Sequence, residues 1–239
     1  MTIWDYELNM KSVAQHKFKD AVYSIEYNQE GECLICGGYF SDLYIISLDG
    51  KLIGKLPTEE SKNFQAIKWI PEKNIAVAYC ETDGMLWVFD FVQKALKFKA
   101  EAHEPEEDIG CIRYDSQKQY LYSCGGDGKI LVWKLDELLN QGKPFKQFEV
   151  EDCFVGAIEL NCTREGDFLA LCSNRDESRL VIWNLENPKP KKSIKLSDDP
   201  AYNMLRCNRK KQLFIKPSKS TNLVILEEPS PAKRSWWLW

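Results

Sequence analysis

A serine, a histidine and an aspartate lie close together near the middle of the chain, at Ser123, His103 and Asp127. These residue types form a hydrolase triad when a histidine activates the serine hydroxyl and a carboxylate orients the histidine. A nucleophilic serine must also be exposed beside an oxyanion hole, and the Gly-x-Ser-x-Gly pattern of a nucleophile elbow does not surround Ser123. We therefore favour a structural role for the three residues and expect no catalytic site.

Cysteine and histidine are the other residue types with chemical potential, and the chain has nine cysteines and two histidines. Cys33 and Cys36 have a CxxC spacing, but they lie in a strand-like run. Residues three apart on a strand point to opposite faces, so the two sulfurs cannot share a metal. We expect no metal, no cofactor and no enzyme activity, and we expect free thiols in a reducing compartment.

Three short apolar runs surround the serine and the aspartate, and they span 109–114, 120–124 and 130–133. Turns separate them, and the Gly-Gly-Asp-Gly turn at 125–128 is typical of a β-hairpin. An apolar run recurs along the chain at a nearly constant spacing. Its marker positions are Trp4, Ile46, Phe89, Trp133, Trp183 and Leu226, at intervals of 42, 43, 44, 50 and 43 residues. The sequence therefore predicts a repeated unit of four short strands, with at most one helical turn at 136–140.

With this period and these strands, the chain resembles the WD40-repeat β-propeller family. In that family a histidine, a serine or threonine, an aspartate and a tryptophan of one repeat often form a buried hydrogen-bonded tetrad. The resemblance assigns these positions to His103, Ser123, Asp127 and Trp133, with Trp-Lys in place of the usual Trp-Asp. The insert 104–108 lengthens the step from the histidine to the next strand. The other repeats retain less of the tetrad.

The resemblance predicts an all-β fold, a WD40 β-propeller over residues 1–228 with about five to six blades, four of them complete. The complete blades are expected at about 21–62, 63–107, 108–153 and 154–200, and the partial blades at 1–20 and 201–228. Three arrangements are open. The chain is a fragment of a longer propeller, or part of a propeller that another chain completes, or a compact ring in which strands near 203–215 complete the first blade. We favour the first two.

The loops that lead from one blade to the next are acidic. Their acidic residues are Glu59, Glu60, Glu104, Glu106, Glu107, Asp108, Glu151, Asp152, Asp198 and Asp199. In a propeller these loops share one face, the top, with the turns between the second and third strands. The opposite loops are basic or mixed, with Lys55 and Lys73 among their residues. One interpretation is a solvated surface; the other is a face that attracts basic segments of a partner.

The C-terminal residues 229–239 are rich in proline and tryptophan. Trp236, Trp237 and Trp239 would form a large apolar patch if exposed. We favour a final outer strand or a truncated end for this segment. The alternative is a hook that docks into a partner, with the three tryptophans as its contact residues.

The composition places the chain among soluble globular proteins. Hydrophobic residues make up 44% of the chain, charged residues 28%, and the net charge is −4, so the chain has no basic signature for nucleic acid. It has no run of 18 apolar residues, so we expect no membrane span. The N-terminus lacks the pattern of a signal peptide.

These observations predict a non-enzymatic WD40 scaffold that mediates protein–protein interactions within a larger cytoplasmic assembly. The resemblance suggests a cytoskeletal or ciliary setting, and a chain that completes the propeller is one expected partner. The alternative is a substrate-receptor subunit of a ubiquitin ligase, because many WD40 receptors carry Trp-Asp-x-Arg after the third strand. The matching sites at Trp4, Trp133 and Trp183 lack the arginine, which counts against this alternative.

Overall fold

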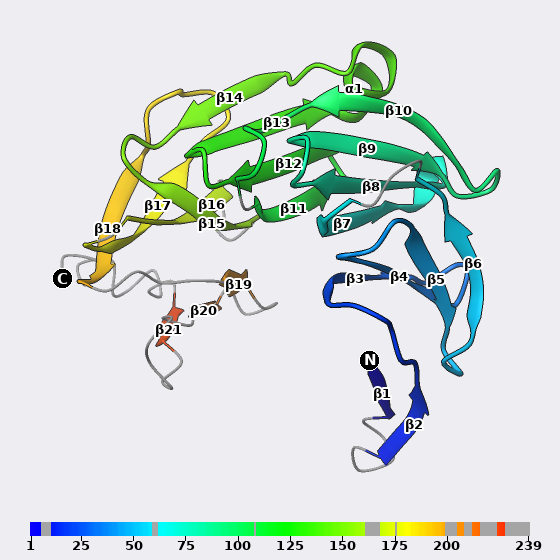
Figure 1. Ribbon diagram of the computed structural model, residues 1–239. Helices are drawn as coiled ribbons and strands as arrows, with labels where there is room; N and C mark the ends of the chain where they lie inside the picture. Colours follow the sequence, from blue (N-terminus) through cyan, green and yellow to red (C-terminus); the bar gives the residue numbers. More distant parts are fainter. Residues whose placement is uncertain are drawn as a thin grey trace.

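Short apolar segments separated by turns fold into antiparallel strands throughout the computed structural model (Figure 1). The structure describes residues 1–5, 11–58, 62–107, 109–160, 168–174, 176–198, 205–207, 212–215 and 224–227. Asp108, Asp199, Glu59, Glu60, Trp236, Trp237 and Trp239 lie outside these residues, as does the segment 229–239.

Four sheets each contain four consecutive antiparallel strands, and we call them the first to fourth blades. The first blade consists of β3 (Val22–Asn28), β4 (Cys33–Gly38), β5 (Leu43–Ser47) and β6 (Leu52–Leu56). The second consists of β7 (Phe64–Ile70), β8 (Ile75–Cys80), β9 (Met85–Asp90) and β10 (Ala95–Glu101). The third consists of β11 (Ile109–Asp115), β12 (Tyr120–Gly125), β13 (Lys129–Lys134) and β14 (Lys146–Glu149). The fourth consists of β15 (Phe154–Glu159), β16 (Phe168–Ser173), β17 (Ser178–Trp183) and β18 (Lys192–Ser197).

The second strand of each blade is almost fully buried, because a sheet stacked between two others is covered on both faces. The apolar cores lie between successive blades. One core joins the first and second blades, a second joins the second and third, and a third joins the third and fourth. The prediction of an all-β chain with four complete blades is therefore confirmed.

Two partial sheets flank the four blades. β1 (Thr2–Asp5) pairs with β2 (Lys11–Gln15), and β19 (Leu205–Cys207), β20 (Gln212–Ile215) and β21 (Val224–Glu227) form a separate sheet. Figure 1 shows these two sheets apart, at opposite ends of an arc of blades. The compact-ring arrangement, in which the strands near 203–215 complete the first blade, is wrong for this structure, since β20 pairs with β19 and β21 in a sheet separate from β1 and β2.

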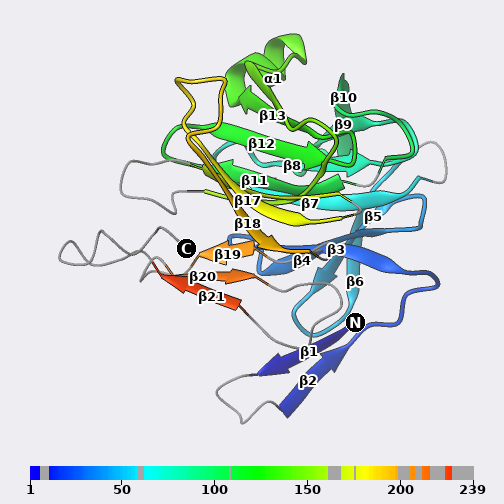
Figure 2. The same ribbon diagram turned by 90° about the vertical axis from the view of Figure 1, so that its left-hand side faces the viewer.

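Two short helices interrupt the strands. The 3-10 helix η1 (Pro71–Lys73) connects β7 to β8, and α1 (Leu135–Gln141) connects β13 to β14 at the outer rim in both views (Figures 1 and 2). α1 is longer than the single turn expected, because Leu135 and Leu138 are buried in the core between the second and third blades. Within the described residues, no helix has the length and apolar character needed to cross a membrane.

Candidate functional site

The four tetrad residues form one hydrogen-bonded chain that runs from the third blade to the loop after β10. Trp133 donates from its indole Nε1 to the Oγ of Ser123 at 3.2 Å, and Ser123 Oγ lies 2.9 Å from Nε2 of His103. The other ring nitrogen of His103, Nδ1, lies 3.0 and 3.1 Å from the two carboxylate oxygens of Asp127. Because a carboxylate only accepts, Nδ1 donates to Asp127, and Nε2 of a neutral ring is free to accept from Ser123. Each polar group in this chain therefore has a partner.

Burial and charge together set the ionisation of Asp127. Burial, the largest single effect on the pKa, disfavours the charged carboxylate. The hydrogen bond and electrostatic attraction from His103, with the Lys129 backbone N–H and the Lys129 charge, together outweigh it. The net result is a pKa of Asp127 below its ordinary value of 3.8. Asp127 therefore remains an acceptor for His103 at neutral pH.

The burial of Ser123 argues against a role as a nucleophile. Its relative exposure is 0%, and the His103 and Asp127 side chains are likewise 0% exposed. A substrate carbonyl must approach a catalytic serine within bonding distance. The geometry instead satisfies buried polar groups and joins the loop after β10 to the turn before β13, which is the structural role that the sequence suggested.

The loop after β10 holds its carboxylates in a fixed arrangement. The backbone N–H groups of Ala102 and His103 donate to the Gly84 carbonyl at 3.2 and 2.9 Å, and Glu106 N–H donates to the Glu81 carbonyl at 2.9 Å. The Tyr79 hydroxyl donates to the carbonyls of Glu104 and Glu107, at 3.4 and 3.2 Å. The side chains of residues 104, 106 and 107 are exposed. The second blade thus positions the backbone that carries the three carboxylates.

Glu151 and Asp152 lie in the next inter-blade loop and are exposed. The turn 125–129 between β12 and β13 contacts both acidic loops. On one side Lys129 pairs with Glu104 at 3.2 Å, and on the other the Val150 N–H donates to the Gly128 carbonyl at 3.0 Å. The two loops are therefore neighbours across one turn. We call Glu104, Glu106, Glu107, Glu151 and Asp152 the acidic loop face.

Two further charged residues are placed differently from the expectation. Asp198 is exposed but forms an ion pair with Lys195, which lies three residues earlier on β18. The Lys195 Nζ is 2.6 Å from the Asp198 Oδ1. Lys55, expected among the loops of the opposite face, lies within β6 and pairs with Asp42 of the turn before β5 at 3.0 Å. The separation of charge between the two faces is therefore weaker in the first and fourth blades than around the third.

The neighbouring blades show what replaces the tetrad where its residues are lost. In the second blade Asp83 accepts directly from the Trp87 indole Nε1 at 3.1 Å, a contact that sequence reasoning missed although the Asp-x-x-x-Trp spacing was visible. In the fourth blade Ser173 and Ser178 bond to each other at 3.1 Å. The buried Nε1 of Trp183 has no acceptor among the described residues.

The thiols and metal-binding residue types show no arrangement for metal chemistry. Seven cysteines have described side chains, and all seven are free thiols. Burial raises the pKa of Cys33 and also that of Cys36, to about 12, so neither thiol ionises readily at neutral pH. In the described part of the chain, no group of three or more His, Cys, Asp or Glu side chains is placed to hold a metal ion.

Comparison with known proteins places the tetrad inside a recognised repeat. A family model described as WD domain, G-beta repeat matches residues 95–134. Cilia- and flagella-associated protein 57 C of Tetrahymena thermophila is 23% identical over 211 residues, which cover 82% of this chain and 16% of the relative. A WD repeat-containing protein of Dictyostelium discoideum is 20% identical over 222 residues, 92% of this chain and 12% of the relative. The chain thus spans less than a fifth of the length of either relative.

A solved structure shows the same fold. The crystal structure of the computationally designed Ika8 protein matches 95% of this chain and 64% of its own chain, with a TM-score of 0.69 and 14% sequence identity. At this identity the likeness concerns the fold alone. Taken with the blade topology, the tetrad and the matched repeat, it shows that the chain contains a WD40 repeat at residues 95–134 within a propeller-like arrangement of blades.

Proposed function

We propose that this chain is a non-enzymatic scaffold that binds other proteins within a larger assembly, and that its acidic loop face binds a basic segment of a partner. The single observation that carries the proposal is the juxtaposition of two acidic loops across the turn 125–129. Backbone hydrogen bonds hold the first loop, and the bond from the Val150 N–H to the Gly128 carbonyl joins the second loop to the turn, so a partner would meet two loops whose backbones are already in position. Preorganised charge lowers the entropy cost of binding.

The acidic loop face has more carboxylates than neighbouring cations that could pair with them. Lys129 neutralises part of the field of Glu104, and the hydrogen bond between them raises the pKa of Lys129, which therefore stays charged. Among the described residues, Glu106, Glu107, Glu151 and Asp152 form no ion pair within 4.0 Å. Exposed like charges repel one another across the turn. A lysine- or arginine-rich segment would relieve that repulsion and gain speed of association from electrostatic steering.

A role as a ubiquitin-ligase substrate receptor has less support. Such receptors need an arginine three residues after the tryptophan that ends the third strand. At the Trp133 site this position is Asp136, an exposed carboxylate that pairs with Lys73 at 3.2 Å. A carboxylate cannot replace the donor groups of an arginine. This function is the runner-up.

The cellular setting is a further part of the proposal. We propose a cytoplasmic location and an assembly of cytoskeletal or ciliary type, supported by the relative whose name associates it with cilia and flagella. Imaging of a tagged protein in a ciliated cell tests it. Enrichment along the axoneme is the expected result, and exclusion from cilia and cytoskeleton would contradict it.

The binding proposal is tested by affinity capture with quantitative mass spectrometry. The test variant neutralises three carboxylates of the acidic loop face, as Glu106→Gln, Glu107→Gln and Glu151→Gln. The control makes the same charge change on exposed loops of the opposite face, as Glu30→Gln, Glu32→Gln and Glu186→Gln. We expect a subset of captured proteins to fall about tenfold with the test variant alone. Equal capture by both variants would refute the acidic-face proposal, and enrichment of ubiquitin-ligase subunits would favour the runner-up.

A further inference from the structure

Two buried cysteines face each other in the third blade. Cys111 of β11 lies directly opposite Cys124 of β12 in the strand register, and the two Sγ atoms are 3.7 Å apart. Residues opposite each other on antiparallel strands have Cα atoms about 4.5–5.5 Å apart, which is within the range that a disulfide bridges. The backbone therefore already has the spacing of a disulfide, and only the side chains need to rotate.

The fourth blade contributes a third group to this pair. The backbone N–H of Ile158 on β15 donates to Cys111 Sγ at 3.1 Å. The side chains of Cys111, Cys124 and Ile158 lie in the same apolar core, between the third and fourth blades. Cys111 therefore takes part in the contact between these two blades as well as in the pair.

Strand register shows that the fold does not need a thiol at position 111. The first strand of every complete blade has a register shift near its start, and Cys111 is the first paired residue after it. The equivalent residues are Ser24, Ala66 and Ala157. Ser24 Oγ accepts from the Ile67 N–H at 3.0 Å, which is the same contact between neighbouring blades. A serine is thus sufficient for this hydrogen bond, and the cysteine at 111 adds a reactive sulfur.

The two thiols differ in how readily they ionise. The hydrogen bond from the Cys124 thiol lowers the pKa of Cys111, and the Arg113 charge and the Ile158 N–H act in the same direction against the effect of burial. Burial and the hydrogen bond to Cys111 raise the pKa of Cys124. Because the thiolate is the form that reacts with an oxidant, Cys111 is the first sulfur to react and Cys124 is the second.

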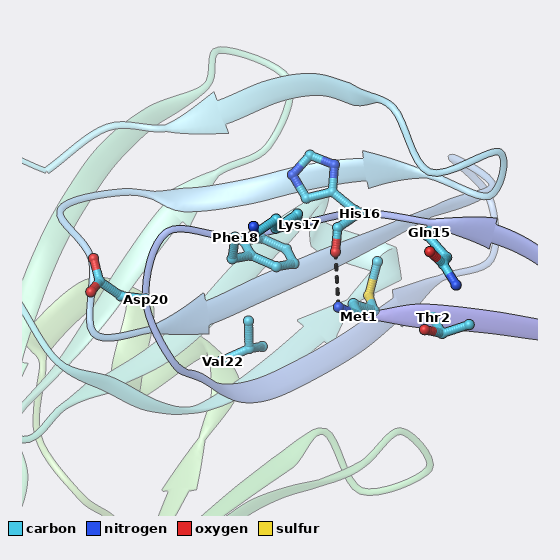
Figure 3. Close-up of a pocket in the computed structure, with 8 residues that line it drawn as sticks. All are labelled: Met1, Thr2, Gln15, His16, Lys17, Phe18, Asp20 and Val22. Carbon is cyan, nitrogen blue, oxygen red and sulfur yellow. Dashed lines mark hydrogen bonds between the residues drawn. The ribbon is translucent and has the colours of Figure 1, made fainter.

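Burial restricts the class of oxidant. Cys111 is 7% exposed and Cys124 is 0% exposed. The cavity of about 490 Å³ beside the start of β1 and the start of β3 offers no route to them, since none of the eight residues that line it is a cysteine (Figure 3). A close-packed core excludes a bulky oxidant such as glutathione disulfide. Hydrogen peroxide is little larger than water, so it is the oxidant that fits this site.

We propose that Cys111 and Cys124 form a dithiol that hydrogen peroxide oxidises reversibly to a disulfide, and that this oxidation weakens the contact between the third and fourth blades. The Cys111 thiolate attacks one peroxide oxygen, so that an S–O bond forms and the O–O bond breaks. The second oxygen leaves as hydroxide and gains a proton to become water.

The second step closes the disulfide. Cys124 loses its proton and attacks Cys111 Sγ, so that the S–S bond forms, the S–O bond breaks and a second water leaves. Two electrons pass from the two sulfurs to the peroxide, and the two thiol protons end in the two waters. A dithiol reductant restores both thiols by exchange. Such a reversible disulfide is compatible with a reducing compartment.

Oxidation changes the hydrogen bond that joins the blades. The negative charge of a thiolate strengthens a hydrogen bond that it accepts, and a disulfide sulfur has no such charge. The Ile158 N–H therefore holds its acceptor less well in the oxidised protein, and its amide hydrogen should exchange faster. The Ile67 N–H is an internal control, because its acceptor is Ser24 and oxidation leaves that hydroxyl unchanged.

Mass spectrometry of the intact 239-residue protein tests the proposal. The reduced protein is freed of reductant, treated with hydrogen peroxide, alkylated and digested with trypsin without reduction. Cleavage after Arg113 and Lys118 separates the two cysteines into peptides 100–113 and 119–129. We expect the cross-link between these peptides to exceed any other disulfide about tenfold and to disappear after treatment with dithiothreitol.

Three variants assign the order of reaction. Cys124→Ser should accumulate a sulfenic acid at Cys111 that dimedone traps, because no second thiol is present to displace it. Cys111→Ser keeps the acceptor, as Ser24 shows, and should leave Cys124 unlabelled by dimedone. Cys153→Ser is the matched control: Cys153 is more exposed than the pair, but burial raises the pKa of its thiol. This control should leave the yield of the cross-link unchanged.

Several results would overturn the proposal. One is a peroxide-treated native protein in which Cys153 is oxidised and the cross-link between Cys111 and Cys124 is absent, which needs no variant to fold. Another is a cross-link that forms only in urea, and a third is dimedone labelling of Cys124 in the Cys111→Ser variant. Hydrogen exchange that is equally fast in segment 155–159 of the oxidised and the reduced protein would refute the effect on the fourth blade.

Discussion

His103 and Asp127 belong to different inter-strand segments, yet Nδ1 of the histidine lies 3.0 and 3.1 Å from the two carboxylate oxygens. The histidine follows β10, the outer strand of the second blade, and the aspartate lies in the turn before β13 of the third. Their contact thus joins two successive blades. It also lies directly beneath the acidic loop that starts at Glu104.

Asp127→Asn should destabilise the protein by about 1–3 kcal/mol. The substitution replaces a buried charge-assisted hydrogen bond with a weaker one, and a group that now donates to the carboxylate loses its acceptor. The comparison is Glu177→Gln in the corresponding turn of the fourth blade. Glu177 pairs with Arg179 and with Lys195, both about half exposed, so solvent screens these pairs and the loss of the Glu177 charge should cost little stability. Urea unfolding of the two variants measures the difference. Equal costs would remove the special role of the tetrad.

The Asp127→Asn effect should depend on pH. The pKa of Asp127 in the folded protein is below its ordinary value of 3.8, so the ionised carboxylate adds stability that is complete above that value. As the pH falls through the folded-state pKa, the carboxylate gains a proton and this contribution is lost. The gap in unfolding free energy between the wild type and the variant should be constant from pH 7 to pH 5 and close below about pH 4. A gap that fails to narrow as the pH falls below about 4 would contradict this account.

Gly84 permits the loop after β10 to lie against the turn between β8 and β9, and its replacement tests how that loop is held. Its φ is +70°, and a Cβ there would lie 2.2 Å from the His103 carbonyl oxygen. Gly84→Ala should therefore cost about 2 kcal/mol or more. Gly142→Ala is the matched control, with φ of +63° but a nearest contact of 3.5 Å, and should cost about 1 kcal/mol for the backbone alone. Similar losses of stability for the two variants in thermal unfolding would show that the close contact at Gly84 contributes nothing.

Trp133, near the end of β13, and Trp183, at the end of β17, should contribute differently to stability when the indole nitrogen is removed. Trp133 donates to Ser123, whereas the buried Nε1 of Trp183 has no acceptor among the described residues. Trp133→Phe loses volume and a hydrogen bond, while Trp183→Phe loses similar volume but removes an unsatisfied donor. We expect the first variant to be less stable by about 1–2 kcal/mol in urea unfolding. The reverse order would contradict the assignment of these contacts.

The sequence predicted the blades well because four-strand units, hairpin turns and buried second strands are local features that period and polarity record. The family resemblance, not the sequence pattern, assigned the four tetrad positions, and the structure brings these side chains together. The sequence did not predict the Asp83–Trp87 hydrogen bond, the Tyr79 contacts that hold the acidic loop, or the exposure of Ile25. These contacts and this exposure depend on how neighbouring segments pack in three dimensions. Ile25 and Ile67 are each the second paired residue after the register shift in the first strand of a blade, yet Ile25 is exposed and Ile67 is buried.

The central claim is that the acidic loop face recognises a basic segment, and a direct titration tests it most simply. A labelled lysine- and arginine-rich peptide is titrated against the wild type, the Glu106→Gln, Glu107→Gln, Glu151→Gln variant and the Glu30→Gln, Glu32→Gln, Glu186→Gln control. At about 0.05 M salt we predict at least tenfold weaker binding for the first variant alone, a difference that shrinks near 0.5 M salt because exposed charges are screened. Equal affinities of the two variants at low salt would contradict the claim.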